Sequence, residues 1–260
     1  MGLAIGVDLG STAIKTVITG EGRTLWRGCT PTVPRQEREA MALIQKGLEE
    51  LAARGIDTQN AEYVSTGYGK KLFTPAQKYV DEITANALGL WTLSGGALRC
   101  GINVGGQDLK ILRVSQEGAV LDFKMNDKCA AGTGRFFEQA ARILDVPLED
   151  FSDLAEQSDR EIALSSTCVV FAESEMVSLL AEGVRKEDII QALMVSVARR
   201  IIGFINDDED LGGIYLDGGP AKNRALVSAL SAELNSPVLT LDEPQYTVAF
   251  GAALSLNGVG

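Results

Sequence analysis

The chain has 260 residues, 45% of them hydrophobic and 23% charged, and a net charge of −11 at pH 7. So acidic a chain offers no basic stripe that could replace the counterions of a nucleic acid, and we expect no nucleic-acid partner. Histidine is absent, which excludes Ser-His and Cys-His catalysis and every histidine-bound metal. No apolar run approaches the ~18 residues of a membrane span, and the N-terminus lacks a signal-peptide pattern. We therefore expect a cytoplasmic protein with no membrane partner.

The first part of the chain alternates short strands with turns and helices. Apolar or alternating stretches bounded by glycine or proline predict strands over 3–7, 13–19, 24–29 and 61–66. Apolar residues at helical spacing predict helices over 38–54 and 82–93. The run Ser94-Gly95-Gly96 is typical of a boundary, so the residues before it are expected to form most of a first lobe.

The same order of elements recurs after this boundary. A strand that ends at Val104 leads into a Gly-rich turn, and further strands are expected over 109–115 and 119–124. At a constant offset of 95 residues the two segments match at three pairs of positions: Asp8 and Asn103, Gly10 and Gly105, Lys15 and Lys110. Self-similarity of this kind indicates two lobes built on one plan of three strands and a helix.

The rest of the chain is expected to extend the second lobe. Predicted helices cover 135–144, 169–180, 188–204, 225–234 and 248–256, and predicted strands cover 213–217 and 238–241. We assign residues 1–95 plus 244–260 to the first lobe and residues 96–243 to the second. The fold class expected from this order is α/β.

The turn after the first strand, Asp8-Leu9-Gly10-Ser11-Thr12, has the composition of a phosphate-binding turn. Glycine lets the backbone approach a phosphate closely, and the turn N–H groups and hydroxyls can donate to its oxygens. Lys15 can add a positive charge, and Asp8 can hold Mg²⁺ directly or through water. The alternative for this motif alone is a plain β-hairpin with a polar tip.

A matching turn in the second lobe, Gly105-Gly106-Gln107-Asp108, favours phosphate binding over that alternative. Two such turns facing each other would define a nucleotide cleft between the lobes. Gly218 and Gly219, which follow a predicted strand, offer a third backbone surface suited to adenosine. The chain has no G-x-x-x-x-G-K-[ST] motif, so the site is not a P-loop.

Four cysteines are present: Cys29, Cys100, Cys129 and Cys168. They are too few and too scattered for a secreted disulfide scaffold, and no C-x-x-C pair indicates a zinc ribbon. Cys129 and Cys168 each precede a predicted helix, where backbone N–H groups and the helix dipole favour a thiolate. Because free cysteine is often buried, two ordinary buried thiols remain the alternative.

Three motifs together resemble the acetate kinase/Hsp70/actin superfamily of ATPases: Asp-x-Gly-Ser-Thr from residue 8, Gly-Gly-Gln-Asp from residue 105 and Gly-Gly-Pro-Ala-Lys-Asn from residue 218. Further segments resemble one branch of it, the reductive activators of 2-hydroxyacyl-CoA dehydratases and their benzoyl-CoA reductase relatives. These segments are Asn-Asp-Lys-Cys-Ala-Ala-Gly-Thr-Gly-Arg-Phe from residue 126, Ser-Ser-Thr-Cys-x-Val-Phe-Ala-Glu-Ser-Glu from residue 165 and Pro-Gln-Tyr from residue 244. The resemblance covers nearly the whole chain.

The resemblance implies a two-lobed actin-like ATPase with duplicated, ribonuclease-H-like β-β-β-α lobes and an interlobe nucleotide cleft. It implies a homodimer that holds one [4Fe–4S] cluster through Cys129 and Cys168 of both chains, and that binds ATP or ADP with Mg²⁺. Ferredoxin or flavodoxin would supply an electron, which ATP hydrolysis would drive to a dehydratase or reductase component. The nucleotide-binding residues implied are Gly10, Ser11, Thr12, Ala13, Lys15, Gly105, Gly106, Gly132, Thr133, Gly134, Gly218, Gly219 and Gln245.

Two positions depart from the family pattern. Asn103 stands where a carboxylate usually opens the second phosphate motif, and Asp217 replaces a small hydroxyl residue. An amide cannot be a general base and is a poorer Mg²⁺ ligand, so we expect slow ATP hydrolysis, with Gln107 and Asp108 left to orient water. On this basis Asn103→Asp is expected to raise the hydrolysis rate.

Two other functions would also explain the phosphate turns. They are a small-molecule kinase of the same superfamily and a non-catalytic, ATP-switched scaffold. Neither function gives Cys129 and Cys168 a role. Iron and sulfide in anaerobically purified protein would separate the activator from both.

Overall fold

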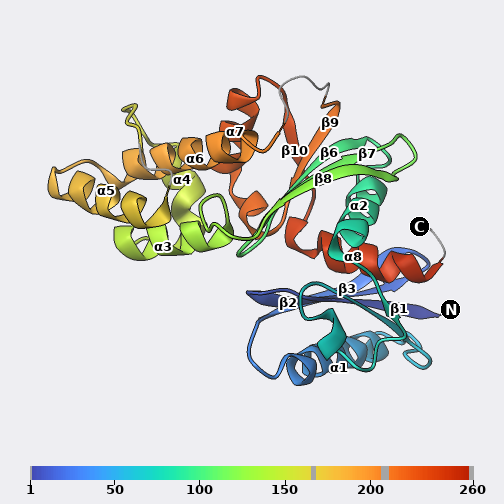
Figure 1. Cartoon of the computed structure of the whole chain (residues 1–260). Coiled ribbons are helices and arrows are strands. Elements are labelled where there is room, and N and C mark those ends of the chain that lie inside the picture. The colour runs from blue at the N-terminus through green and yellow to red at the C-terminus, as the bar shows by residue number, and fades with distance from the viewer. Residues whose placement is uncertain (1, 165–167, 206–210, 258–260) are drawn as a thin grey trace. The chain divides into compact units, whose positions relative to one another are not determined.

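The computed structural model describes residues 2–164, 168–205 and 211–257 (Figure 1). By its internal contacts the chain divides into two compact units. Unit 1 comprises Met1–Gly101, Leu112–Phe123 and Gln245–Gly260, and unit 2 comprises Ile102–Ile111 and Lys124–Pro244. The lobe limits inferred from the sequence stay a prediction. The triplet Ser165-Ser166-Thr167 of the second cysteine motif lies outside the described residues.

The first sheet lies in unit 1 and has five strands in the order β3-β2-β1-β4-β5. Its central strand β1 is buried along its whole length and pairs antiparallel with β2 and parallel with β4. In this register Asp8 lies opposite Lys15 on one side and Thr66 on the other. The strands are β1 (Leu3–Leu9), β2 (Ala13–Gly20), β3 (Arg23–Pro31), β4 (Glu62–Thr66) and β5 (Lys78–Tyr79).

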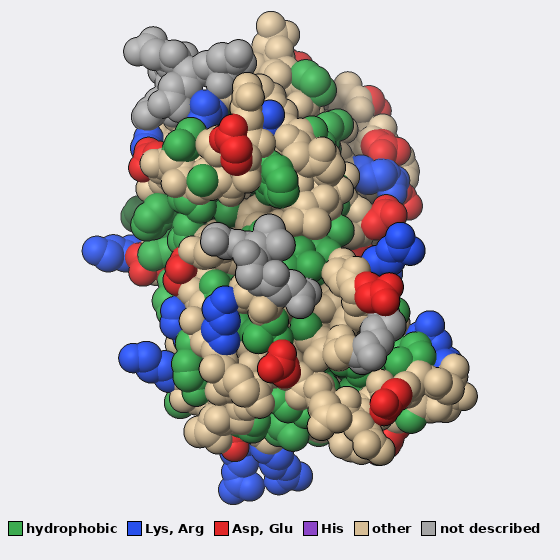
Figure 2. Space-filling model, turned by 90° about the vertical axis from the view of Figure 1, so that its right-hand side faces the viewer, with side chains coloured by type: hydrophobic (Ala, Val, Ile, Leu, Met, Phe, Trp, Pro, Cys, Tyr) green, Lys and Arg blue, Asp and Glu red, His purple; other side chains and the backbone are tan. Residues whose placement is uncertain are grey.

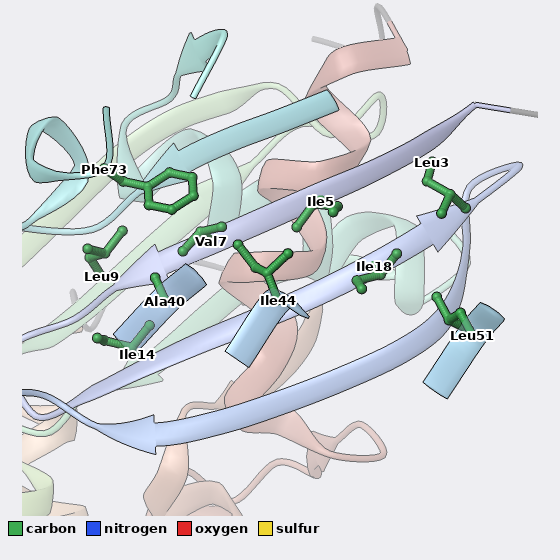
Figure 3. Packing of buried hydrophobic residues seen from close by; sticks show 10 residues of the cluster. All are labelled: Leu3, Ile5, Val7, Leu9, Ile14, Ile18, Ala40, Ile44, Leu51 and Phe73. Atoms are coloured by element: carbon green, nitrogen blue, oxygen red, sulfur yellow. The ribbon is translucent and has the colours of Figure 1, made fainter. Parts of the chain in front are cut away.

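Helices cover both faces of this sheet. Alternate residues of β1 point to opposite faces, and all of them are buried, which requires cover on both sides. Helix α1 (Gln36–Ala53) lies against one face. Figure 3 shows the apolar cluster that joins them: Leu3, Ile5, Val7, Leu9, Ile14, Ile18, Ala40, Ile44, Leu51 and Phe73. On the other face lies α8 (Thr247–Leu254), every residue of which is buried. The sheet end that carries Asp8 is thus held from both sides.

The second sheet repeats the first. Its order is β10-β9-β6-β7-β8, so β6 to β10 take the places that β1 to β5 take in the first sheet. Boundaries between the two units fall within β6, β7 and β8. The internal repeat predicted from the sequence is therefore confirmed. The strands are β6 (Leu98–Val104), β7 (Leu109–Val114), β8 (Val120–Asn126), β9 (Gly213–Asp217) and β10 (Val238–Thr240).

The remaining helices follow the sequence pattern closely. Asp81 begins α2 as a capping residue, because its side chain accepts a hydrogen bond from the Thr84 N–H. The sequence analysis missed β5 and α4, which are too short to show a period. The helices are α2 (Glu82–Leu93), α3 (Gly134–Leu144), α4 (Phe151–Ala155), α5 (Val169–Ala181), α6 (Lys186–Ile202) and α7 (Arg224–Glu233).

Charged side chains of both signs are interspersed on the face shown in Figure 2, so neither charge dominates it. Among the residues that the structure describes, no helix is long and apolar enough to cross a membrane.

Close backbone packing joins α2 and α8 within unit 1. A Cβ added to Gly251 of α8 would overlap the Ala85 carbonyl oxygen of α2, and one added to Gly89 would overlap the Thr247 carbonyl oxygen. A Cβ on Gly6 of β1 would likewise overlap the Ala249 carbonyl oxygen. Glycine at these helix and strand positions is therefore required by approach distance, despite its poor helix propensity.

The change Gly251→Ala tests this packing. Alanine normally stabilises a helix relative to glycine by about 1 kcal/mol, but here the methyl group has no room beside Ala85. We expect the free energy of unfolding to fall by roughly 1–3 kcal/mol, measured by urea unfolding. The matched control is Lys46→Ala on the exposed face of α1, which should change little. Unchanged or increased stability in Gly251→Ala would contradict the close approach.

Candidate functional site

The first glycine turn connects β1 and β2 in unit 1. The Gly10 N–H donates to the Ala13 carbonyl oxygen at 3.2 Å, which closes a tight turn over Ser11 and Thr12. A Cβ on Gly10 would lie 2.8 Å from that same oxygen, so a larger residue would open the turn. The structure therefore gathers the predicted residues Asp8, Gly10, Ser11, Thr12, Ala13 and Lys15 at one end of the sheet.

A buried ion pair stands beside this turn. Lys15 Nζ donates to Asp8 Oδ2 at 3.0 Å, and the two side chains are 21% and 3% exposed. Burial disfavours the charged ammonium, but the adjacent Asp8 carboxylate outweighs this effect and raises the pKa of Lys15 above 10.5. The other carboxylate oxygen, Asp8 Oδ1, is buried and has no hydrogen-bond partner among the described residues. That oxygen can ligate Mg²⁺ directly or accept a hydrogen bond from a water bound to it, so the residues present fit the cation.

The second glycine turn connects β6 and β7, and the Gly105 N–H donates to the Asp108 carbonyl oxygen at 2.9 Å. This bond is the counterpart, 95 residues later, of the bond between Gly10 and Ala13. Gln107 is exposed at the tip, whereas Asp108 is buried and accepts from Lys110 Nζ at 2.7 Å.

The start of α3 is bonded directly to this second turn. The Gly134 N–H donates to the Gly105 carbonyl oxygen at 2.8 Å, and the Arg135 N–H donates to the Gly106 carbonyl oxygen at 2.9 Å. The two turn carbonyls thus satisfy N–H groups that a helix start leaves without intrahelical partners. Of the predicted residues, Gly134 therefore lies against the predicted turn, and Gly132 and Thr133 directly precede it.

Asn103 on β6 and Asp217 at the end of β9 are joined inside unit 2. The Asn103 side-chain amide donates to Asp217 Oδ1 at 2.9 Å, and the residues are 4% and 0% exposed. Gly218 follows at φ +90°, and its N–H donates to the Pro244 carbonyl oxygen. Gly219 begins a short 3₁₀ turn, and a Cβ there would meet no atom within 4 Å. Gln245 lies in the 3₁₀ turn Pro244–Tyr246 that leads into α8.

The four cysteines differ in environment. Cys100 is buried in β6 and Cys29 is exposed on β3. Cys168 is exposed and is the N-cap residue of α5, as the sequence pattern predicted. Cys129 is partly exposed in the loop before α3, whose N-cap is Thr133. No cluster of three or more His, Cys, Asp or Glu side chains gathers as a metal site within the described part of the chain.

One basic residue that the sequence analysis did not single out reaches Cys129. The guanidinium of Arg200, on α6, donates to Cys129 Sγ at 3.4 Å. Helix α3 packs against α5, and α5 packs against α6. The helices that follow Cys129 and Cys168 are therefore neighbours. Arg200 lies 71 residues from Cys129 along the chain, so no spacing rule could have paired them.

The comparisons with known proteins agree with this geometry. The chain matches the BadF/BadG/BcrA/BcrD ATPase family over residues 5–255. It is 38% identical over 251 residues to the activator of lactoyl-CoA dehydratase of Anaerotignum propionicum. The aligned region covers 96% of this chain and 95% of that protein.

Two solved structures are similar over nearly their whole length, each at 34% identity. One is the (R)-2-hydroxyglutaryl-CoA dehydratase component A of Acidaminococcus fermentans, with a TM-score of 0.88 and coverage of 98% of this chain and 97% of that one. The other is the activator of 2-hydroxyisocaproyl-CoA dehydratase of Clostridium difficile with bound ADPNP, with a TM-score of 0.90 and coverage of 99% and 95%.

Duplicated five-stranded sheets with a glycine turn after the first strand of each define an α/β protein of the actin-like ATPase class, and the predicted fold class is confirmed. Within that class, the chain belongs to the BadF/BadG/BcrA/BcrD ATPase family. The resemblance to the dehydratase activators is thereby confirmed as well. The individual site residues stay predictions, because the relatives establish the family and not the role of each side chain.

Removing the ammonium of Lys15 tests how much the first turn depends on the ion pair. At pH 7 Lys15→Met leaves the Asp8 carboxylate buried without its charge partner, and we expect the free energy of unfolding to fall by roughly 3 kcal/mol. The exposed pair Arg135–Glu138 provides the matched control, and Arg135→Met should cost less than about 1 kcal/mol. Urea unfolding of both variants gives the comparison, and equal losses would contradict the buried pair.

The same pair predicts a pH dependence. Because the folded-state pKa of Lys15 is raised above 10.5, the stabilisation that its charge provides is fully present below 10.5. It is lost as the pH rises through the raised pKa. On the alkaline side, the difference in free energy of unfolding between the parent chain and Lys15→Met should therefore narrow as the pH rises through the raised pKa of Lys15.

Proposed function

We propose that this chain is an ATP-dependent reductive activator. It uses ATP binding and hydrolysis to drive one electron at low potential to a partner enzyme of the 2-hydroxyacyl-CoA dehydratase type. Family membership and the printed functions of the relatives support the activity. The observation that carries the proposal is the pair of backbone hydrogen bonds between the second glycine turn and the start of α3.

The nucleotide is bound by the two glycine turns. The turn glycines let the backbone come close to a phosphate, and turn N–H groups and the Ser11 and Thr12 hydroxyls can donate to its oxygens. Asp8 Oδ1 is the buried acceptor for Mg²⁺ or its water, and Lys15 supplies positive charge beside it. Support for nucleotide binding also comes from the relative solved with ADPNP. The interlobe placement of the nucleotide stays a prediction.

The backbone bonds at Gly134 and Arg135 link the nucleotide turn to the cysteine segment. If bound phosphate displaces the turn at Gly105 and Gly106, the first turn of α3 must follow or lose both bonds. The segment that carries Cys129 ends at the N-cap Thr133 and moves with it. ATP can shift this arrangement only by binding one geometry more tightly than another. A sugar kinase or a scaffold has no need for such a link to a thiol.

Cys129 and Cys168 are the residues that would hold the iron–sulfur cluster. A thiolate-bound [4Fe–4S] cluster takes up and releases single electrons at a potential set by charge and by hydrogen bonds to its sulfurs. The residues present fit such a group: both thiols are accessible, Cys168 stands at the N-cap position of α5, and Cys129 accepts a hydrogen bond from Arg200. Two cysteines per chain supply half of four ligands, so we propose a homodimer that shares one cluster.

The partners follow from this arrangement. A ferredoxin or flavodoxin is the proposed electron donor, and a dehydratase or reductase component is the proposed acceptor. Relatives named for lactoyl-CoA dehydratase and for benzoyl-CoA reductase support both kinds of acceptor. The decisive assay mixes the anaerobic chain, a reduced one-electron donor and the dehydratase component, and it measures dehydration with and without ATP. Equal dehydration without ATP would refute the proposal.

The change Asp8→Asn tests the nucleotide half of the proposal. An amide keeps the shape but loses the charge that positions Mg²⁺, so we expect ATP hydrolysis to fall at least tenfold, about 1.4 kcal/mol of barrier. The change also removes the charge partner of Lys15, so some loss of stability is expected, and hydrolysis is compared well below the melting temperature of the variant. Asp57→Asn, at an exposed loop position of the same unit, is the matched control. A hydrolysis rate equal to the parent's would move the metal site elsewhere.

The cysteine half is tested by four separate Cys→Ser changes. Cys129→Ser and Cys168→Ser should each lose the oxygen-labile cluster, whereas Cys29→Ser and Cys100→Ser should keep it, because the last two precede no helix of unit 2. Iron and sulfide are measured per chain after anaerobic purification, alongside the visible absorption of the cluster. We expect about two irons per chain if four thiolates of a dimer hold one cluster. About four irons per chain would rule out sharing.

A further inference from the structure

The internal repeat extends to the fourth strand of each sheet. Strands β4 and β9 each end one residue before a glycine with positive φ, Gly67 at +86° and Gly218 at +90°. A Cβ on Gly67 would lie 2.7 Å from the Leu9 carbonyl oxygen, and one on Gly218 would overlap the Val104 carbonyl oxygen. Leu9 and Val104 are again 95 residues apart. The last residues of the two strands, Thr66 and Asp217, are therefore equivalent.

Because of this equivalence the two halves can be compared strand by strand, and they carry their carboxylate on different strands. In the first half Asp8 on β1 lies opposite Thr66 on β4. In the second half the β1-equivalent residue is Asn103, and the β4-equivalent residue is Asp217, to which the Asn103 amide donates at 2.9 Å. Each half thus pairs one acid with one neutral polar residue at its central strand ends.

We propose that Asp217 supplies, from β9, the carboxylate that Asp8 supplies from β1, and that it positions Asn103 for ATP hydrolysis. This inference rests on the proposed ATPase function. Asp217 is fully buried and Asn103 nearly so, so the hydrogen bond between them is shielded from bulk water. Asp217 stands one residue before Gly218 at the end of β9, in the place that Thr66 takes before Gly67 at the end of β4.

The hydrogen bond fixes what Asn103 can offer. In this pair the Asn103 NH₂ group donates and Asp217 Oδ1 accepts. The Asn103 carbonyl oxygen is then held facing away from Asp217, where it can accept from water or ligate a cation. Asn103 and Asp217 together present the negative charge and the acceptor oxygen that one aspartate presents in the first half.

The equivalent lysines of the two halves also bind acids at different positions. In the first half Lys15 binds the acid of the central strand, Asp8. In the second half the equivalent Lys110 binds Asp108 in the turn, at 2.7 Å. Asp108, which the sequence analysis left to orient water, is thus bonded to a buried ammonium. Asp108 therefore lies in the turn beside Lys110, whereas Asp217 bonds to the residue equivalent to Asp8.

The structure reverses the expectation for Asn103→Asp. That change would set two carboxylates within hydrogen-bond distance in a buried site, where like charges repel strongly. We now expect it to lower hydrolysis when made alone. Made together with Asp217→Thr, it rebuilds the aspartate and threonine pair of the first half, and hydrolysis should return.

The experiment measures steady-state ATP hydrolysis of the full chain over ranges of ATP and Mg²⁺, with melting temperature as the folding check. Asp217→Asn and Asp217→Thr should each lower kcat at least about tenfold while KM for ATP stays within about threefold. Both should raise the Mg²⁺ concentration at half-maximal rate. The double variant Asn103→Asp/Asp217→Thr should recover kcat to within about threefold of the parent.

Asp188→Asn is the matched control, because Asp188 is another buried carboxylate of unit 2 that binds only Ser158, Asp159 and Arg160 in the hydrogen bonds resolved for it. It should lower the melting temperature without changing kcat. Parent kcat in both Asp217 variants, or a rise in Asn103→Asp alone, would overturn the inference. If Asp217→Asn does not fold, the hydrolysis rate of the double variant tests the inference, because the inference requires one carboxylate, on β6 or on β9. Absence of hydrolysis in the parent would instead refute the proposed function.

Discussion

Two backbone hydrogen bonds fix the start of α3 on the second glycine turn, and the arrangement of unit 2 depends on them. They join Gly134 to Gly105 and Arg135 to Gly106. A helix start must satisfy its first N–H groups somewhere, and here turn carbonyls do so. Glycine at position 134 favours this contact, because a Cβ there would lie 3.2 Å from the Gly106 Cα, which is tighter than most Cβ contacts. The turn and the helix therefore cannot move independently.

This constraint continues into the cysteine segments through side-chain packing. Helix α3 packs on α5, which begins at the N-cap Cys168, and α5 packs on α6, which carries Arg200. Arg200 in turn contacts the sulfur of Cys129. Packed side chains and rigid helices are one means by which distant sites are coupled. The helices of unit 2 provide such a chain between the turn and both thiols.

Duplication gave both halves one architecture but not one chemistry. The order of strands is the same in both sheets, and so are the hydrogen bonds that close the turns at Gly10 and Gly105. Backbone geometry is shared because glycine is needed wherever chain segments approach each other. The acids lie on different strands: Asp8 is on β1 beside Thr66 on β4, whereas Asp217 is on β9 beside Asn103 on β6. Backbone geometry therefore constrains such a site more tightly than the identity of each polar residue.

The sequence by itself determined most of the fold. Alternating and helical periods placed nearly every strand and helix within a few residues, and the offset between Gly10 and Gly105 revealed the repeat. These features are local, so spacing along the chain is enough to detect them. The very short elements β5 and α4 were missed because two and five residues show no period. Motif residues also pointed correctly to the family.

Only the tertiary structure decided which side chains meet. Asn103 and Asp217 are 114 residues apart, and Arg200 and Cys129 are 71 apart. No local period links residues at such distances, because it is the order of strands in the sheet and the packing of helices that bring them together. The sequence showed two unusual residues at positions 103 and 217. That they form one hydrogen-bonded pair is a property of strands β6 and β9 lying side by side.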